Sequence, residues 1–277
     1  MSDMGAQLGR REFLSRAGKT LAAAGAGLSL AAEPIAQAKV QDDLDKYDFL
    51  LPRVKFKCSM SVRDRWHAFP GADRNFLAQL SSVVRCKVKL PQNCNDNKPH
   101  DGSMTQFNAV VDLESIEQMR KYPFLFMTAS GTYSLSKKKK QNIYQYVHEG
   151  GFLYMDECVH GINDDGDFFY QSSYKILVDT FGAAEVKRIP NGHEIFHNVY
   201  NLGDIGLPYI IGQYHGARGV SIGERLAIFL SSTDIHCGWV DKTGKWFGRG
   251  GKMGIGKHGH KEAIQMGINI VMYAVSH

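Results

Sequence analysis

The sequence predicts an α/β protein, built as a three-layer sandwich in which helices cover both faces of a mostly parallel sheet. Short apolar runs typical of buried strands, such as residues 124–128 and 152–155, alternate with stretches whose apolar residues recur at helical spacing. Strands that alternate with helices favour a parallel sheet with crossover helices. The chain has 277 residues, 43% of them hydrophobic, which is enough for one sizeable domain of this class.

In the first part of the chain, two alternating segments flank one helical segment. Residues 54–58 (VKFKC) and 84–90 (VRCKVKL) alternate apolar and basic side chains, which is typical of strands with one face in water. Between them, Asp73 is a suitable N-cap for a helix. The apolar side of that helix carries Phe76, Leu77, Leu80 and Val83.

The central part predicts a strand–helix–strand unit. The helix between residues 124–128 and 152–155 can begin at Ser134 or Ser136, and Gly150 suits the position just after its end. Its inner stripe carries Ile143, Tyr146 and Val147. The two strands are therefore expected to be parallel, with a right-handed crossover.

The last part predicts two more helices and two more strands. Asp167 can cap a helix that runs to Phe181, and residues 184–189 and 225–232 are the strands. The chain closes with a helix from about Lys261. This helix is expected to be buried along Ile264, Ile268, Val271 and Val275.

The N-terminus resembles a twin-arginine signal peptide. Arg10-Arg11 is followed by Phe13-Leu14, a weakly apolar stretch rich in Ala and Gly, and the cleavage pattern Ala-Gln-Ala at residues 36–38. The resemblance implies cleavage after Ala38 and export to the periplasm, or otherwise out of the cytoplasm, of a bacterium. The apolar stretch is too short and glycine-rich for a stable membrane span. Residues 39–52 form a lead-in segment, and residues 53–277 form one domain.

Charge and cysteine content limit the function classes. The formal charge of +5 becomes 29 − 25 = +4 without residues 1–38, and no basic stripe interleaved with aromatic residues indicates nucleic-acid binding. The run of four lysines at residues 137–140 is interpreted as a solvated helix face. Five cysteines leave at least one outside any disulfide, and no C-x-x-C spacing predicts a zinc knuckle.

Polar residues follow three of the predicted strands. Ligands of open parallel sheets bind beyond the carboxyl ends of the strands, so these residues are expected to share one crevice if the strands are neighbours. The candidate ligand-binding residues are Ser130, Asp156, Glu157, Cys158, His160, Asp234, His236 and Cys237. The ligand, whether a small molecule or a protein partner, is not specified by the sequence.

Several segments together resemble a bacterial family known as domain of unknown function 4159. They are DRWHAFPGADRNFL, YPFLFMTASG, LSKKKKQNIYQYVHEGGFLYMDEC, HEIFHNVY and MGINIVMYAV, and they span nearly the whole chain after the signal peptide. The resemblance implies a flavodoxin-like sheet related to class I glutamine amidotransferases. It implies no particular reaction.

The amidotransferase likeness raises the alternative of a cysteine-dependent amidase or related hydrolase. In those relatives the nucleophilic cysteine stands on a strand-to-helix turn within G-x-C-x-G, and a His-x-Glu pair precedes the last helix. Cys158 has the corresponding position, and His260 and Glu262 form such a pair. The leading glycine is absent, and Glu157 beside the sulfur is expected to raise the pKa of the thiol.

A metal-dependent enzyme, loaded before export, is the third alternative. Zinc, copper or iron would suit the thiol, imidazole and carboxylate groups at residues 156–160 and 234–237, although no cofactor is required. His193 and His197 spell H-E-x-x-H, but the Pro190-Asn191-Gly192 segment just upstream predicts a loop instead of a protease helix. An exported, non-catalytic ligand-binding protein is the favoured interpretation.

Overall fold

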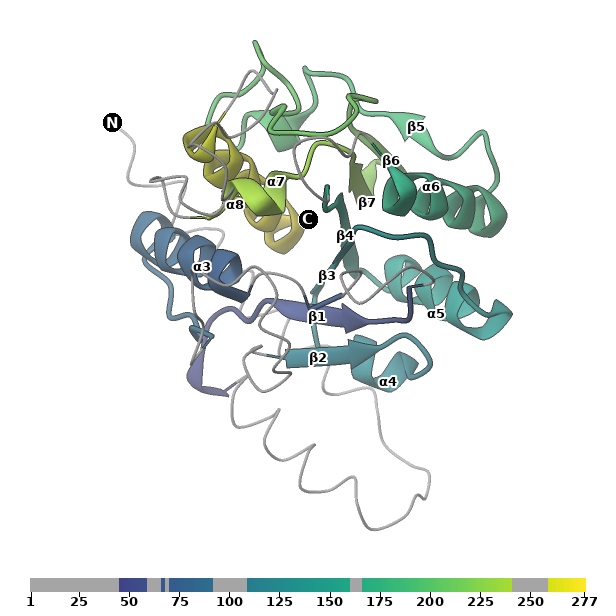
Figure 1. Ribbon diagram of the computed structural model, residues 1–277. Helices are drawn as coiled ribbons and strands as arrows, with labels where there is room; N and C mark the ends of the chain where they lie inside the picture. Colours follow the sequence, from purple (N-terminus) through teal and green to yellow (C-terminus); the bar gives the residue numbers. More distant parts are fainter. Residues whose placement is uncertain (1–44, 59–65, 68–69, 92–108, 160–165, 241–258) are drawn as a thin grey trace.

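The computed structural model describes residues 45–58, 66–67, 70–91, 109–159, 166–240 and 259–277 (Figure 1). In this part of the chain, seven strands form one sheet in the order β2-β1-β3-β4-β7-β6-β5. The strands are β1 (Pro52–Lys55), β2 (Ala109–Asp112), β3 (Phe124–Ala129), β4 (Phe152–Glu157), β5 (Lys187–Arg188), β6 (Arg218–Ile222) and β7 (Arg225–Ser231). The five from β2 to β7 are parallel, and β6 and β5 continue the sheet antiparallel. The mixed α/β class with a mostly parallel sheet is therefore confirmed.

Helices cover both faces of the sheet (Figure 1). One face packs against α3 (Pro70–Val84), the short α7 (Ile235–Gly238) and α8 (His260–Ser276), and the other packs against α4 (Ile116–Met119), α5 (Lys137–His148) and α6 (Phe168–Phe181). Side chains alternate between these faces along β4: Phe152 and Tyr154 belong to the first core, and Leu153 and Met155 belong to the second. Full burial on both faces explains the continuous apolar runs of the central strands.

The β3–α5–β4 unit agrees closely with its prediction. Strands β3 and β4 pair in parallel over six residues, from Phe124 with Phe152 to Ala129 with Glu157. Ser136 is the N-cap of α5, since its side chain accepts a hydrogen bond from the backbone N–H of Lys139. Gly150 adopts a φ of 103° just after the helix, a left-handed conformation that glycine allows without steric cost.

Other predictions for the first part of the chain were wrong. Residues 84–90 form no strand, and only Val88 makes an isolated bridge, with Phe49. Arg85 breaks the extended pattern because its φ is 54°. Helix α3 begins at Pro70 rather than at Asp73, which is buried in its first turn, and Val83 is exposed.

The predicted signal peptide at residues 1–38 and the first part of the lead-in, residues 39–44, lie outside the described residues. Within the lead-in, Phe49, Leu50 and Leu51 are buried beside β1, so they belong to the folded core. No helix in the described ranges is long and apolar enough to cross a membrane.

Candidate binding site at the carboxyl ends of β4 and β7

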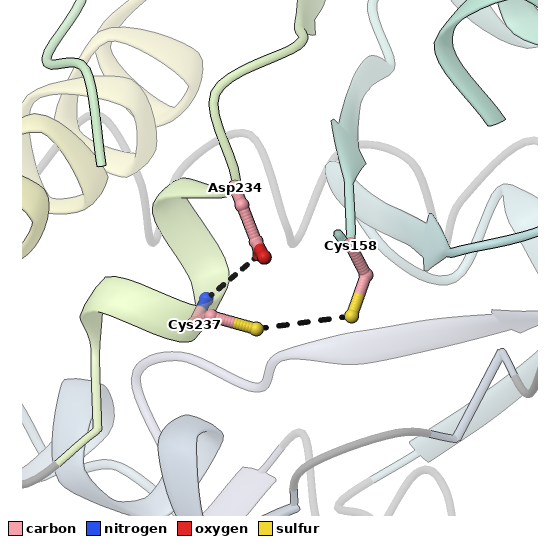
Figure 2. Close-up of side chains that lie close together, drawn as sticks. All are labelled: Cys158, Asp234 and Cys237. Atoms are coloured by element: carbon pink, nitrogen blue, oxygen red, sulfur yellow. Dashed lines mark hydrogen bonds between the residues drawn. The ribbon is translucent and has the colours of Figure 1, made fainter. Parts of the chain in front are cut away.

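Two cysteines that are far apart in the sequence meet beyond the ends of β4 and β7. Because Met155 pairs with Leu230 and Asp156 with Ser231, the segments that follow these neighbouring strands leave the sheet side by side. Cys158 comes directly after β4 and Cys237 lies on α7, and their Sγ atoms are 3.7 Å apart (Figure 2). Both side chains are buried.

Asp234 connects the two segments. One oxygen of its carboxylate accepts a hydrogen bond from the backbone N–H of Val159 at 2.8 Å. The other accepts from the backbone N–H of Cys237 at 3.2 Å (Figure 2). The second bond caps the N-terminus of α7. Together, the bonds hold Cys158 and Cys237 in a fixed relation.

The strained residue of the site is Asp234, not Cys158. Asp234 has a φ of 54° and a ψ of 49°, a left-handed conformation that is uncommon for a non-glycine residue. A catalytic nucleophile on a strand-to-helix turn uses such strain to keep its side chain exposed. Among the described residues, Arg85 and Asp234 are the non-glycine positions with positive φ, so Cys158 does not form this kind of turn.

The side chain of Asp156 lies on the same face of β4 as Cys158, and it supports α7. Its carboxylate is in hydrogen-bond contact with the hydroxyl of Ser231, and it accepts a bond from the backbone N–H of His236 at 2.7 Å. Asp156 is fully buried, and burial followed by the charge of Asp234 raises its pKa to about 8. Burial also raises the pKa of Asp234 to about 7.

The same surroundings disfavour thiolates. The hydrogen bond with Cys237 lowers the pKa of Cys158, but burial and the carboxylates of Asp234, Glu157 and Asp156 outweigh it, so the net pKa lies above the ordinary value. The hydrogen bond with Cys158 and then burial raise the pKa of Cys237 well above its usual range. Reactive cysteines have the opposite property, a lowered pKa in positively charged surroundings.

A buried ionic cluster, which the sequence did not predict, lies next to this site. Arg53 on β1 donates two hydrogen bonds to the carboxylate of Asp73 on α3, each 2.8 Å long. The Nε2 atom of His236 is 2.9 Å from both an Asp73 oxygen and an Arg53 nitrogen. Burial and then Arg53 lower the pKa of His236 to about 4, so the imidazole is neutral at neutral pH. The only feature of the sequence that points to this cluster is Asp73, which stands three residues before the apolar pair Phe76-Leu77.

Glu157 lies on the other face of the sheet. It alternates with Asp156 and Cys158 along β4, and its carboxylate accepts a hydrogen bond from the backbone N–H of Tyr170 in the first turn of α6. Asp167, the N-cap residue of that helix, makes no capping bond and instead contacts His215. Glu157 is therefore a structural anchor for α6, on the face opposite the cysteine pair.

The remaining predicted site residues have other surroundings. Ser130 is half-buried and directly follows β3, next to the point where the Cys158 N–H bonds to the Ala129 carbonyl. His260 contacts the carbonyl of Gly238 at 2.9 Å, and Glu262 accepts from the backbone N–H of Gly259. These contacts begin α8 and do not join His260 or Glu262 to each other or to Cys158. His160 lies outside the described residues.

The H-E-x-x-H segment is not a protease helix. Residues Glu194–Phe196 form one short 3-10 turn, His193 accepts a bond from the N–H of Ile195, and His197 contacts Asn201 and the carbonyl of Asn191. The two imidazoles therefore stabilise a loop, as the upstream proline and glycine predicted.

An open surface hollow lined by the Lys137–Lys140 region of α5 and by Asp179 lies in the helical layer opposite the cysteine pair.

These features define a class of protein: an α/β fold whose mostly parallel sheet carries a buried thiol–carboxylate cluster at the carboxyl ends of its central strands. The model of one family, described as a domain of unknown function (DUF4159), matches residues 51–275, from β1 into α8. The chain belongs to this family. No curated protein matches the chain.

Proposed function

We propose that this chain is an exported ligand-binding protein with a fold like that of class I glutamine amidotransferases, in which Cys158 contributes to a binding site and is not a hydrolytic nucleophile. One observation carries the proposal: within the part of the chain that the structure describes, the Cys158 thiol faces a second thiol and a carboxylate inside the protein, and no histidine base contacts it. A hydrolytic cysteine needs a base within hydrogen-bond reach and access for its substrate.

The electrostatics of the site support the same function. Burial, and after it three carboxyl groups near Cys158, outweigh the hydrogen bond with Cys237 and raise the pKa of the Cys158 thiol, so the thiolate is scarce at neutral pH. The candidate base and its orienting glutamate, His260 and Glu262, are engaged at the start of α8. Export rests on the paired arginines and the Ala-Gln-Ala pattern at residues 36–38.

Cysteine labelling tests this proposal. The folded, reduced protein is treated with iodoacetamide at pH 7, and peptide mass spectrometry follows each cysteine over time. Cys58 and Cys86, which are half-buried and far from the cluster in sequence, are the internal controls. We expect Cys158 to react at least about tenfold more slowly than Cys58, because a thiol with a raised pKa is rarely ionised.

A second reagent addresses hydrolase chemistry directly. A glutamine analogue that carries a diazoketone alkylates the nucleophilic cysteine of an amidotransferase-like active site. We expect no stoichiometric labelling of Cys158 by this reagent. Rapid labelling at Cys158 by either reagent would overturn the proposal and favour a cysteine-dependent amidase.

A further inference from the structure

Cys158, Cys237 and Asp234 form a compact set of metal-ligand atoms. Their two Sγ atoms and a carboxylate oxygen all lie within 4.8 Å of one another, and all three residues are buried. It is the one such cluster of three or more His, Cys, Asp or Glu residues among the described residues. We propose that it binds a thiophilic divalent metal ion of the zinc type, an inference that rests on the proposed ligand-binding function and names the ligand class.

The spacing of the two sulfur atoms fits this ion. With Zn–S bonds of about 2.3 Å and tetrahedral angles, two coordinated sulfurs stand about 3.8 Å apart. The Sγ atoms of Cys158 and Cys237 are 3.7 Å apart. The pair can therefore bind one ion without a change in the separation of its sulfurs.

The donor set selects the class of metal. Thiolates are soft ligands that favour zinc or copper(I), whereas magnesium and calcium prefer sites made of oxygen atoms alone. Binding replaces the proton of each thiol with a bond to the metal, so the two thiols release two protons for each divalent ion bound, and Asp234 also releases its proton where it is protonated. The Asp234 carboxylate adds an oxygen ligand, as in zinc sites of mixed donors.

The backbone holds these ligands in place before an ion arrives. Asp234 uses one lone pair on each oxygen to accept the N–H groups of Val159 and Cys237, which leaves further lone pairs for a metal. Its left-handed conformation, with a φ of 54°, directs the carboxylate between the two segments. Three protein ligands leave a fourth tetrahedral position for water or an exogenous ligand.

The experiment uses cobalt(II) as a spectroscopic substitute for zinc. The protein is reduced with a phosphine, freed of metal with a chelator and titrated with cobalt(II). The background variant Cys58→Ser, Cys86→Ser, Cys94→Ser retains only Cys158 and Cys237. A sulfur-to-cobalt charge-transfer band in this background can therefore come only from the proposed ligands. We expect such a band to saturate at one equivalent and to be abolished by one equivalent of zinc.

Three ligand variants complete the test. Cys158→Ser, Cys237→Ser and Asp234→Asn are each expected to weaken zinc affinity by more than about 100-fold, beyond the effect of losing an outer partner of a metal ligand. Circular dichroism confirms that each variant is folded before it is titrated. The background variant with its two remaining cysteines keeps the inference falsifiable even if a ligand variant does not fold.

Several results would overturn the inference. They are the absence of a charge-transfer band in the folded background variant, undiminished zinc affinity in the folded Cys158→Ser variant, and a Cys158–Cys237 disulfide in protein isolated from the exporting cell. Slow alkylation of Cys158 without metal binding would overturn the metal inference and leave the proposed non-catalytic role standing. Rapid labelling by the glutamine analogue would overturn the proposed function itself.

Discussion

The Arg53–Asp73 pair shows how much a single buried charge contributes at the residue scale. Arg53 is fully buried and Asp73 nearly so, and their bidentate contact joins β1 to α3. His236 brings α7 into the same cluster. Removal of one partner leaves the other charge buried without compensation, which is far more costly than replacing both. The pair therefore helps to position α7, which carries Cys237.

Asp73→Ala is expected to lower the free energy of unfolding by about 3–5 kcal/mol. The double variant Arg53→Met, Asp73→Leu should recover most of this loss, because it removes both charges and keeps the volume apolar. Urea unfolding followed by circular dichroism measures all three proteins. Glu149→Ala, which breaks an exposed pair with Arg120, is the matched control and should cost at most about 1 kcal/mol. Equal costs in the buried and exposed pairs would contradict this account.

The same pair predicts a pH dependence. Burial alone would raise the pKa of Asp73, but the charge of Arg53 and the contact with His236 lower it to a net value below the ordinary one. An aspartate with a lowered pKa stabilises the fold above its unfolded pKa of about 3.9, and this contribution is lost as the pH falls. His236, whose pKa is lowered to about 4, also makes the fold less stable as the pH falls. The reason is that the unfolded chain takes up the proton of this histidine first, below about pH 6.5.

Urea unfolding of the metal-free protein from pH 7 down to pH 3 measures this effect. The wild type should lose at least about 1 kcal/mol more stability on acidification than the Arg53→Met, Asp73→Leu variant. The comparison of two proteins removes the contributions of other groups, such as Asp156, whose raised pKa acts in the opposite direction. Parallel stability curves for the two proteins would rule out this role of Asp73.

At the scale of elements, α8 supports the site through close packing against the residue that follows α7. The indole N–H of Trp239 donates to the carbonyl of Ala263, and Trp239 stacks on Phe76 of α3 with ring centroids 4.1 Å apart. A methyl group added at Gly267 would lie 2.7 Å from Phe76 and 2.8 Å from Trp239. Helix α8 therefore needs a glycine at this position to approach both rings.

Gly267→Ala should consequently destabilise the protein by about 1–3 kcal/mol, the usual cost of overpacking a core. Helix propensity alone predicts the opposite, a gain of about 1 kcal/mol. Urea unfolding of the variant decides between the two. Gly192→Ala is the control, because an added methyl group there meets nothing within 4 Å, and it should change stability by less than about 0.5 kcal/mol. A more stable Gly267→Ala variant would show that α8 tolerates a wider separation from the rings of Phe76 and Trp239.

Elements with strong periodicity could be predicted, and elements defined by distant partners could not. The apolar runs of β3, β4 and β7 and the apolar face of α5 are visible in their own residues, so these elements could be predicted. Cys158 and Cys237 meet because the strands that precede them, β4 and β7, are neighbours. Strands β2 and β6 were missed, because four or five residues of mixed polarity become strands only through pairing. The turn at Asp234 depends on its hydrogen bond with Val159, 75 residues away, and the position of Glu157 depends on its hydrogen bond with Tyr170, 13 residues away.

At the scale of the whole molecule, the N-terminal arginines are expected to determine where the protein resides. Replacement of Arg10 and Arg11 by Lys keeps the charge but alters the paired-arginine signal, so it should block export and leave the uncleaved chain in the cytoplasm. Cell fractionation and intact mass spectrometry measure both effects, and wild-type protein should begin at Lys39. Arg16→Lys, in the same segment, is the matched control and should be exported normally. Export of the double-lysine variant at the wild-type level would contradict the twin-arginine assignment.

Metal binding at Cys158, Asp234 and Cys237 would also stabilise the molecule as a whole, because these residues join the β4 and β7 segments only in the folded state. A ligand at 100 times its dissociation constant adds about 2.7 kcal/mol to the free energy of unfolding. For a chain of this size that corresponds to a rise in Tm of roughly 5–10 °C. Thermal unfolding with zinc, and with magnesium at the same concentration, measures the effect. Zinc should raise the Tm of the wild type and of the Cys58→Ser, Cys86→Ser variant equally, while magnesium, which prefers oxygen ligands, should leave both unchanged. The Cys158→Ser, Cys237→Ser variant should not respond to zinc, and an undiminished response would place the stabilising ion elsewhere in the protein.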